Sequence, residues 1–154
     1  MMPELTYRRA IPDDVGAIAA VSAAVWQEQG ESSGLREPLT TAEGVANRLT
    51  EYDDRSAILL CKGDEGTRGF ALLEEPYAPE EGAAIMGVWV LPSTQRQGTG
   101  RELALMALEF ARMAGCLKLR GTLPPGNETA LSFFSEIGAL AHSLGQGMQY
   151  ELPL

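Results

Sequence analysis

The stretch Ala83-Ala84-Ile85-Met86-Gly87-Val88-Trp89-Val90, continued by Leu91-Pro92-Ser93-Thr94 and Gln95-Arg96-Gln97-Gly98-Thr99-Gly100, decides the fold. Its apolar opening predicts a buried strand, and the polar glycine loop leads into a helix. On that helix apolar residues recur every three or four positions, at Leu103, Met106, Ala107, Phe110 and Met113 or Ala114. Gly115 is placed to end the helix as a C′ glycine.

A strand, a glycine loop and a helix N-terminus together predict an anion-binding site. The first turn of a helix leaves backbone N–H groups unpaired, and the helix dipole favours negative charge there. Arg96 and Arg101 flank the loop and add positive charge. A Walker loop is not indicated, because Arg101 and Glu102 stand where Lys and Ser or Thr are required. A dinucleotide fingerprint would need a glycine at Leu103.

The spacing Gln-x-x-Gly-x-Gly from Gln95 to Gly100, shortly after Val-x-Pro at Val90 to Pro92, resembles the acyl-CoA-binding motif of the GNAT superfamily. These proteins are acyl-CoA-dependent N-acyltransferases. The resemblance implies that the loop binds the CoA pyrophosphate through Arg96, Gln97, Gly98, Thr99, Gly100 and Arg101. It also implies that Val88, Trp89 and Val90 bind the pantetheine arm through their backbone. The alternative is a generic strand-to-helix turn that contains glycines.

A second stretch, Asn127 to Ala139, resembles the later motif of the same family. Asn127 is placed to cap a helix that ends at Gly138, and the resemblance implies that it reaches the pantetheine arm. The family often carries a Tyr where Phe134 stands, and that hydroxyl protonates the departing thiolate. Phe134 has no such proton, so it is interpreted as part of the core or as a wall of the pantetheine slot.

The catalytic groups are predicted around the central strand. Glycine inside a strand often marks a bulge, and the resemblance implies a bulge at Gly87 that aims the backbone N–H of Val88 at the thioester carbonyl. Many GNAT enzymes carry a Glu on this strand, but the matching positions here are Met86 and Gly87. Carboxylates on the preceding strand end and loop, at Glu74, Glu75 and Glu81, are the candidates for the general base, with Glu75 and Glu81 preferred. His142 is interpreted as structural.

The function predicted first is transfer of an acetyl group from acetyl-CoA, the co-substrate, to a small-molecule or peptide amine. Direct attack in a ternary complex is favoured because no Cys or Ser stands in a setting typical of a nucleophile. No metal is predicted. Phe134 and the missing strand Glu motivate a second hypothesis, a non-catalytic acyl-CoA-binding or regulatory module. A third is a phosphate-binding domain unrelated to CoA.

Length and composition bound these hypotheses. At 154 residues and 45% hydrophobic, the chain suffices for one core, so residues 1–154 are predicted to form a single domain. A net charge of −9 argues against nucleic acid as a partner. No apolar run has membrane-spanning length and no signal peptide opens the chain, so a cytoplasmic protein is expected.

Cys61 and Cys116 are predicted to be buried free thiols. Exposed C-terminal strand edges are compatible with a homodimer.

The periodicities predict an α/β (α+β) fold with a mixed central sheet flanked by helices. Strands are expected at 5–10, 56–62, 68–73, 83–90, 117–123, 139–144 and 148–152, and helices at 12–26, 41–52, 101–114 and 127–137, with a loop over 27–40. The order is β-α-α-β-β-β-α-β-α-β-β, which resembles the GNAT arrangement. The resemblance implies that the strands beginning near Ala83 and Leu117 splay apart to admit acyl-CoA.

Overall fold

The protein is described from a computed structural model, in which residues 5–30, 37–51, 56–74, 82–92, 98–123, 140–144 and 147–153 are placed. The elements are β1 (Thr6–Arg9), η1 (Pro12–Asp14), α1 (Val15–Gln29), η3 (Glu37–Thr40), α2 (Ala42–Thr50), β2 (Ala57–Gly63), β3 (Gly66–Glu74), β4 (Ala83–Val90), α3 (Thr99–Met113), β5 (Lys118–Leu123), β6 (Leu140–Leu144) and β7 (Gly147–Pro153). This order confirms the predicted succession of strands and helices. The helix expected over 127–137 lies outside the described residues.

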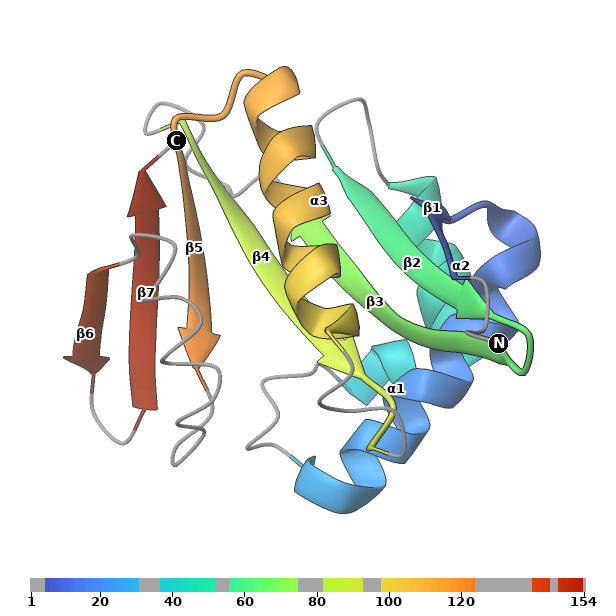
Figure 1. The fold of residues 1–154 in the computed structure, drawn as a ribbon. Helices are drawn as coiled ribbons and strands as arrows, with labels where there is room; N and C mark the ends of the chain where they lie inside the picture. Colours follow the sequence, from blue (N-terminus) through green and yellow to red (C-terminus); the bar gives the residue numbers. More distant parts are fainter. Residues whose placement is uncertain are drawn as a thin grey trace.

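The described strands form one seven-stranded sheet in the order β1-β2-β3-β4-β5-β7-β6. Neighbouring strands are antiparallel except for β4 and β5, which are parallel. The mixed sheet expected from the sequence is therefore confirmed. The one parallel pair lies in the middle of the sheet, where α3 makes the crossover from β4 to β5 (Figure 1).

Helices cover both faces of the sheet. Figure 1 shows α3 in front of the central strands and α1 and α2 behind them. Strand residues alternate between the two layers: Leu59, Ala71, Met86 and Leu119 pack with Leu103 of α3. On the opposite face, Ile58, Phe70 and Leu72 pack with Ile18 of α1 and Val45 of α2. The central strands β2, β3 and β4 thus contribute to both cores.

The helix ends follow local chemistry. Thr41 caps α2 as predicted, because its Oγ1 accepts a hydrogen bond from the N–H of Gly44 at 3.1 Å. The loop predicted over 27–40 was wrong at both ends, since α1 continues to Gln29 and η3 begins at Glu37. Gln27 to Gln29 are good helix formers, and Gly30 ends the helix with a φ of 56°.

The buried face of α3 differs from the predicted one at its C-terminal end. Leu103, Ala104, Ala107 and Ala111 are buried against the sheet. Of the two alternatives that the spacing gave for the end of this face, Met113 is 82% exposed and Ala114 is half-buried. The face is built largely from alanines, whose small side chains let a helix lie close to the strands. Neither Cys61 nor Cys116 is part of a disulfide, as predicted, but Cys61 is fully buried and Cys116 only partly so.

Candidate functional site

The two parallel strands β4 and β5 pair over only three positions and then separate. Ala83 pairs with Lys118, Ala84 with Leu119 and Ile85 with Arg120. Beyond Ile85, β4 continues to Val90, and β5 continues to Leu123, without further pairing between them among the described residues. Figure 1 shows the two strands diverging toward the end of the sheet at which α3 begins. The splaying expected between these strands is confirmed.

Backbone groups of β4 face this opening. Leu91 N–H donates to the Arg68 carbonyl at 2.7 Å, and this bond fixes the phase of the antiparallel pairing between β3 and β4. Hydrogen-bonded pairs alternate along such a ladder, so Gly87 and Trp89 direct their backbone groups at β3. Val88 and Val90 direct theirs to the other side, where β5 has diverged. Three residues were expected to bind pantetheine through the backbone. The backbone groups of Val88 and Val90 face the opening, whereas those of Trp89 face Phe70 on β3.

The N-terminus of α3 stands at the same end of β4. The first N–H to bond within the helix ladder is that of Glu102, which donates to the Gly98 carbonyl at 3.0 Å. The N–H groups of Thr99 and Gly100 precede it and point out of the helix end. Gly98 adopts a φ of 82°, in the left-handed region that favours glycine. A Cβ atom there would meet nothing within 4 Å, so the described residues leave this backbone open to a ligand.

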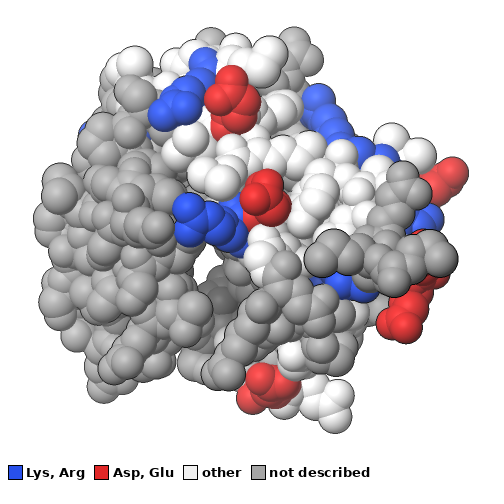
Figure 2. All heavy atoms as spheres, in the orientation of Figure 1, with Lys and Arg blue, Asp and Glu red and all other residues white. Residues whose placement is uncertain are grey.

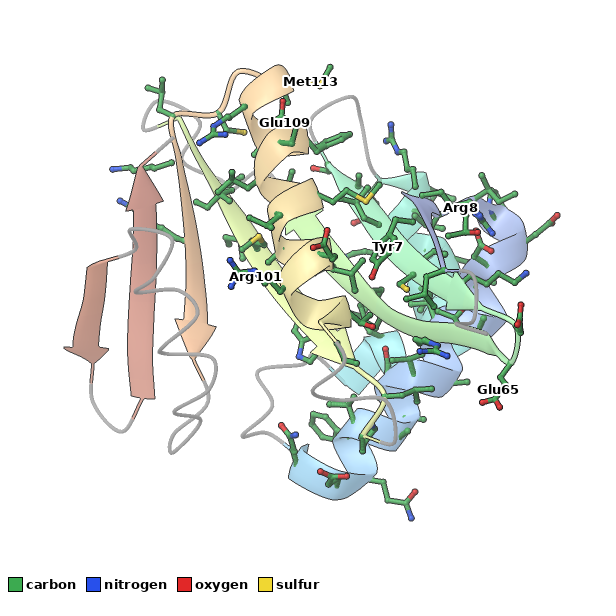
Figure 3. All side chains as sticks on the ribbon, in the orientation of Figure 1. Tyr7, Arg8, Glu65, Arg101, Glu109 and Met113 are labelled. Atoms are coloured by element: carbon green, nitrogen blue, oxygen red, sulfur yellow. The ribbon has the colours of Figure 1, made fainter. Side chains whose placement is uncertain are left out.

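The first turn of α3 is packed directly on β4. A Cβ atom on Gly100 would lie 3.4 Å from Val90 Cγ2 and 3.9 Å from Val88 Cγ1, and Thr99 is buried. The amides of the helix end are therefore held beside the open edge of β4. Arg101 projects from α3 toward the gap between β4 and β5 (Figure 3). Over the described part of this face of the molecule, acidic and basic side chains are interspersed among uncharged ones (Figure 2).

Tyr7 of β1 packs against the core between the sheet and α3. Its side chain points toward α3 (Figure 3), and its register partner on β2 is Cys61. Burial, followed by a hydrogen bond with the Cys61 thiol, raises the pKa of Tyr7 to about 12, while Thr99 acts in the opposite direction. The phenol is therefore neutral and structural at physiological pH. Nothing in the sequence pattern had singled it out.

The bulge predicted at Gly87 is wrong. Pairing between β3 and β4 runs in unbroken register from Gly69 with Val90 to Glu74 with Ile85. Gly87 has a different purpose, because the indole of Trp89 occupies the space that a Cβ atom at Gly87 would need. The ring of Trp89 also packs against Phe70, with 5.3 Å between centroids. The backbone N–H of Val88 faces the opening because backbone groups alternate in direction along a regular strand, so no bulge is needed.

Of the candidate bases, the structure describes only Glu74. Its carboxylate is held by Arg48 of α2: Nη2 donates to Oε1 at 3.0 Å, and Nε lies 2.8 Å from Oε2 in an ionic contact. Glu75 and Glu81 lie outside the described residues. No sequence pattern indicates the role of Arg48, because its partner is 26 positions away. His142 lies on β6, at the edge of the sheet, separated from β4 by β5 and β7.

Part of the predicted site is brought together by the fold. Val88, Val90, Gly98, Thr99, Gly100 and Arg101 meet where β4 ends and α3 begins. Arg96, Gln97, Asn127 and Phe134 lie outside the described residues.

No helix in the described part of the chain combines the length and apolar character that crossing a membrane requires.

The residues present fit acetyl-CoA as a co-substrate. A pyrophosphate needs unpaired N–H donors and room at the backbone, and Gly98 with the first turn of α3 offers both. The pantetheine arm carries amide groups that can pair with an open strand edge, and Val88 and Val90 offer one.

Comparison with known proteins agrees with this geometry. The model of the acetyltransferase (GNAT) family matches residues 22–139. No curated protein sequence matches significantly. Similar solved structures include a ribosomal-protein-alanine N-acetyltransferase from Brucella melitensis (TM-score 0.82, 18% identity, covering 97% of this chain and 99% of that one). The PaiA N-acetyltransferase from Thermoplasma acidophilum, in complex with coenzyme A, gives a TM-score of 0.79 at 17% identity, covering 98% and 99%.

A phosphinothricin acetyltransferase from Sinorhizobium meliloti, in complex with acetyl-CoA, is also similar, with a TM-score of 0.78 at 13% identity, covering 97% of this chain and 88% of that one. At such identities these likenesses concern the fold, whereas the family model matches most of the chain. The chain belongs to the GNAT acetyltransferase family.

Proposed function

We propose that this protein transfers an acetyl group from acetyl-CoA to a primary amine by direct attack within a ternary complex. The observation that carries the proposal is the divergence of β4 and β5 after Ile85, with backbone groups of Val88 and Val90 facing the opening. The N-terminus of α3 lies at the end of the same opening. An anion and an extended amide chain are thus accommodated side by side.

Each part of acetyl-CoA has assigned residues in this proposal. Gly98, Thr99, Gly100 and Arg101 bind the pyrophosphate, together with Arg96 and Gln97. Val88 and Val90 bind the pantetheine arm through their backbone, and Asn127 reaches the same arm while Phe134 lines its slot. The first four residues and the two valines are supported by the described geometry; the others rest on their positions in the sequence.

The chemistry requires a neutral amine, a polarised carbonyl and a thiolate that can leave. We assign carbonyl polarisation to the backbone N–H of Val88, since it faces the opening. A CoA thiol has a pKa of about 8.5, like a cysteine thiol, so its thiolate departs without an obligatory acid in place of Phe134. Glu75 and Glu81 are assigned as the residues that accept the amine proton, directly or through water.

A second candidate function is a non-catalytic acyl-CoA-binding module. One observation favours it: no carboxylate stands on β4, where Met86 and Gly87 occupy the positions of interest. In that case acetyl-CoA binds but no amine promotes release of its thiol.

The deciding experiment is calorimetric titration of the protein with acetyl-CoA, followed by thiol release over a broad panel of amines. Binding with amine-dependent release supports the transferase. Binding with no release from any amine supports the module, and absence of binding contradicts both.

We further propose that residues 1–154 act as one domain in the cytoplasm, with a small-molecule or peptide amine as acceptor. We also propose that exposed strand edges permit a homodimer.

A further inference from the structure

An ion pair joins α2 to the sheet close to the point where β4 and β5 separate. Arg48 of α2 contacts both carboxylate oxygens of Glu74, which is the last residue of β3. The two side chains are 24% and 17% exposed. Because both heads are largely withdrawn from solvent, their geometry is more strongly constrained than that of a surface pair.

The register of the sheet places Glu74 beside the opening. Glu74 pairs with Ile85 on β4, and Ile85 in turn pairs with Arg120 on β5 in the last pair before the strands diverge. Residues that pair directly across strands lie on one face. Leu72, two positions before Glu74, packs in the core that α1 and α2 cover, so Glu74 belongs to that face, opposite α3.

Glu74 is chemically distinct within this region. Strands β2, β3, β4 and β5 carry no other acidic residue. Ile85 precedes Val88 by three positions, a distance of roughly 10 Å along a strand. A glutamate side chain covers part of that distance, and the acceptor nitrogen together with the thioester carbonyl that it attacks covers the remainder. Contacts from the Glu74 carboxylate to the amine, and from the attacked carbonyl to the Val88 amide, therefore have the required combined length.

The surroundings of this carboxylate suit a cation. Gly87 follows Ile85 by two positions on the same face, and the indole of Trp89 covers it. An aromatic ring and a carboxylate on one face are the two groups that bind ammonium ions in proteins. Arg48 holds the carboxylate from the side of α2.

We infer that Glu74 binds the ammonium group of the acceptor and that Arg48 is the positioning residue that holds Glu74 for this purpose. The inference rests on the proposed function and deepens it, because it selects acceptors that bear a positive charge at the nitrogen to be acetylated. Glu74 confers specificity for that charge, whereas Glu75 and Glu81 keep their assigned proton-accepting role.

The test compares Glu74→Gln with Glu109→Gln. Glu109 lies on α3 and is an exposed carboxylate 3.7 Å from Arg112, so it serves as the matched control. Loss of a charge-assisted hydrogen bond predicts that Glu74→Gln raises the KM for the amine roughly 10-fold or more. The affinity for acetyl-CoA should stay within about twofold of the wild type. Glu109→Gln should change neither quantity.

A second readout is independent of turnover and of the folding of the Glu74 variant. Thermal shifts of the CoA-saturated wild type are measured with alaninamide and with lactamide, in which a hydroxyl replaces the ammonium. We expect alaninamide, but not lactamide, to raise the melting temperature of the wild type. In Arg48→Gln the two compounds should have the same effect. In Arg48→Lys part of the difference between them should remain.

Equal amine KM values in Glu74→Gln and Glu109→Gln would overturn the inference, as would equal stabilisation of the wild type by both probes. A wild type that neither probe stabilises overturns it too. The proposed function is judged separately, by acetyl-CoA binding and thiol release in the wild type, so the two can fail independently.

Discussion

The indole ring of Trp89 lies over Gly87, two residues earlier on the same face of β4, and fills the space in which a side chain at Gly87 would have to sit. The same ring packs on Phe70 of β3. Gly87 and Trp89 therefore hold the indole in place on the face of β4 that is turned toward α1 and α2. Glu74 and Ile85, which pair across β3 and β4, are next to them on this face.

Gly87→Ala should destabilise the protein by about 1–3 kcal/mol, because the added methyl forces the indole out of its packed position. The free energy of unfolding in urea measures this loss. In a Trp89→Leu background the same substitution should cost much less, since the ring is gone. Gly16→Ala is the control: nothing lies within 4 Å of its Cβ position on α1, so that change should stabilise the helix. Equal costs in both backgrounds would contradict the explanation.

Gly98→Val should abolish acetyl-CoA binding while the fold is retained. The left-handed φ of 82° disfavours a β-branched residue, and the side chain would enter the space before the α3 N-terminus. Gly115→Val is a matched control, because Gly115 has a φ of 87° and similarly open surroundings at the other end of the helix. Both variants should lose comparable stability, on the order of 1–3 kcal/mol. Calorimetry should show lost affinity only for Gly98→Val; retained affinity there would remove Gly98 from the site.

Asp14 should contribute stability that is lost in acid. The Arg8 guanidinium, 2.7 Å away, lowers the pKa of Asp14, and the N–H of Ile11 assists while burial opposes. A lowered folded pKa gives stability above the unfolded value of about 3.9, which is lost as pH falls through the folded pKa.

Asp14→Asn should therefore lower the melting temperature at pH 7 and flatten its further decrease between about pH 4 and pH 2. Thermal melts over this range measure both effects. Asp13→Asn, at the exposed neighbouring position, should leave the acid decrease as in the wild type. A wild-type profile in Asp14→Asn would contradict the role given to the ion pair.

Tyr7 should have the opposite influence at high pH. Its pKa is raised to about 12 by burial and by the Cys61 contact, whereas in the unfolded chain the phenol ionises at about pH 10. The unfolded state therefore releases a proton first, and stability should fall as pH rises from about 10 to 12. Tyr7→Phe should lessen this decrease. Urea unfolding at pH 8 and at pH 10.5 gives the comparison, and an unchanged difference between the two pH values would show that other groups cause the decrease.

Much of the fold follows from local patterns in the sequence. The strand Ala83–Val90 was predicted at its observed bounds, because a run of apolar residues between a glycine and a proline has few other structures available. Thr41 begins α2 through its side-chain cap, and Gly115 follows the end of α3 with a positive φ, as their chemistry predicts. The extension of α1 to Gln29 was missed, since polar helix formers resemble a loop when only hydrophobic spacing is considered.

The site was less accessible to such reasoning. The glycine loop and the start of α3 could be identified because they are contiguous in the chain. The pairing of Arg48 with Glu74 could not, since it depends on how α2 packs against β3. Gly87 was interpreted as a bulge because a strand glycine is compatible with either a bulge or a tight side-chain neighbour. Only the observed register and the position of the Trp89 ring distinguish these two cases.

The three residue pairs between β4 and β5 give the sheet a seam. On one side of it, β1 to β4 are joined by ladders, of which the β2–β3 ladder shifts register between Cys61 and Lys62; on the other side, β5 to β7 form ladders of their own. Among the described residues, strand pairing across the seam is limited to Ala83, Ala84 and Ile85 of β4, and the Gly82 carbonyl accepts a further hydrogen bond from the N–H of Leu117 at 2.7 Å. The two halves are therefore held together at the seam more by side-chain packing than by ladder hydrogen bonds, since Leu119 of β5 is buried in the core that α3 shares with Ala84 and Met86 of β4.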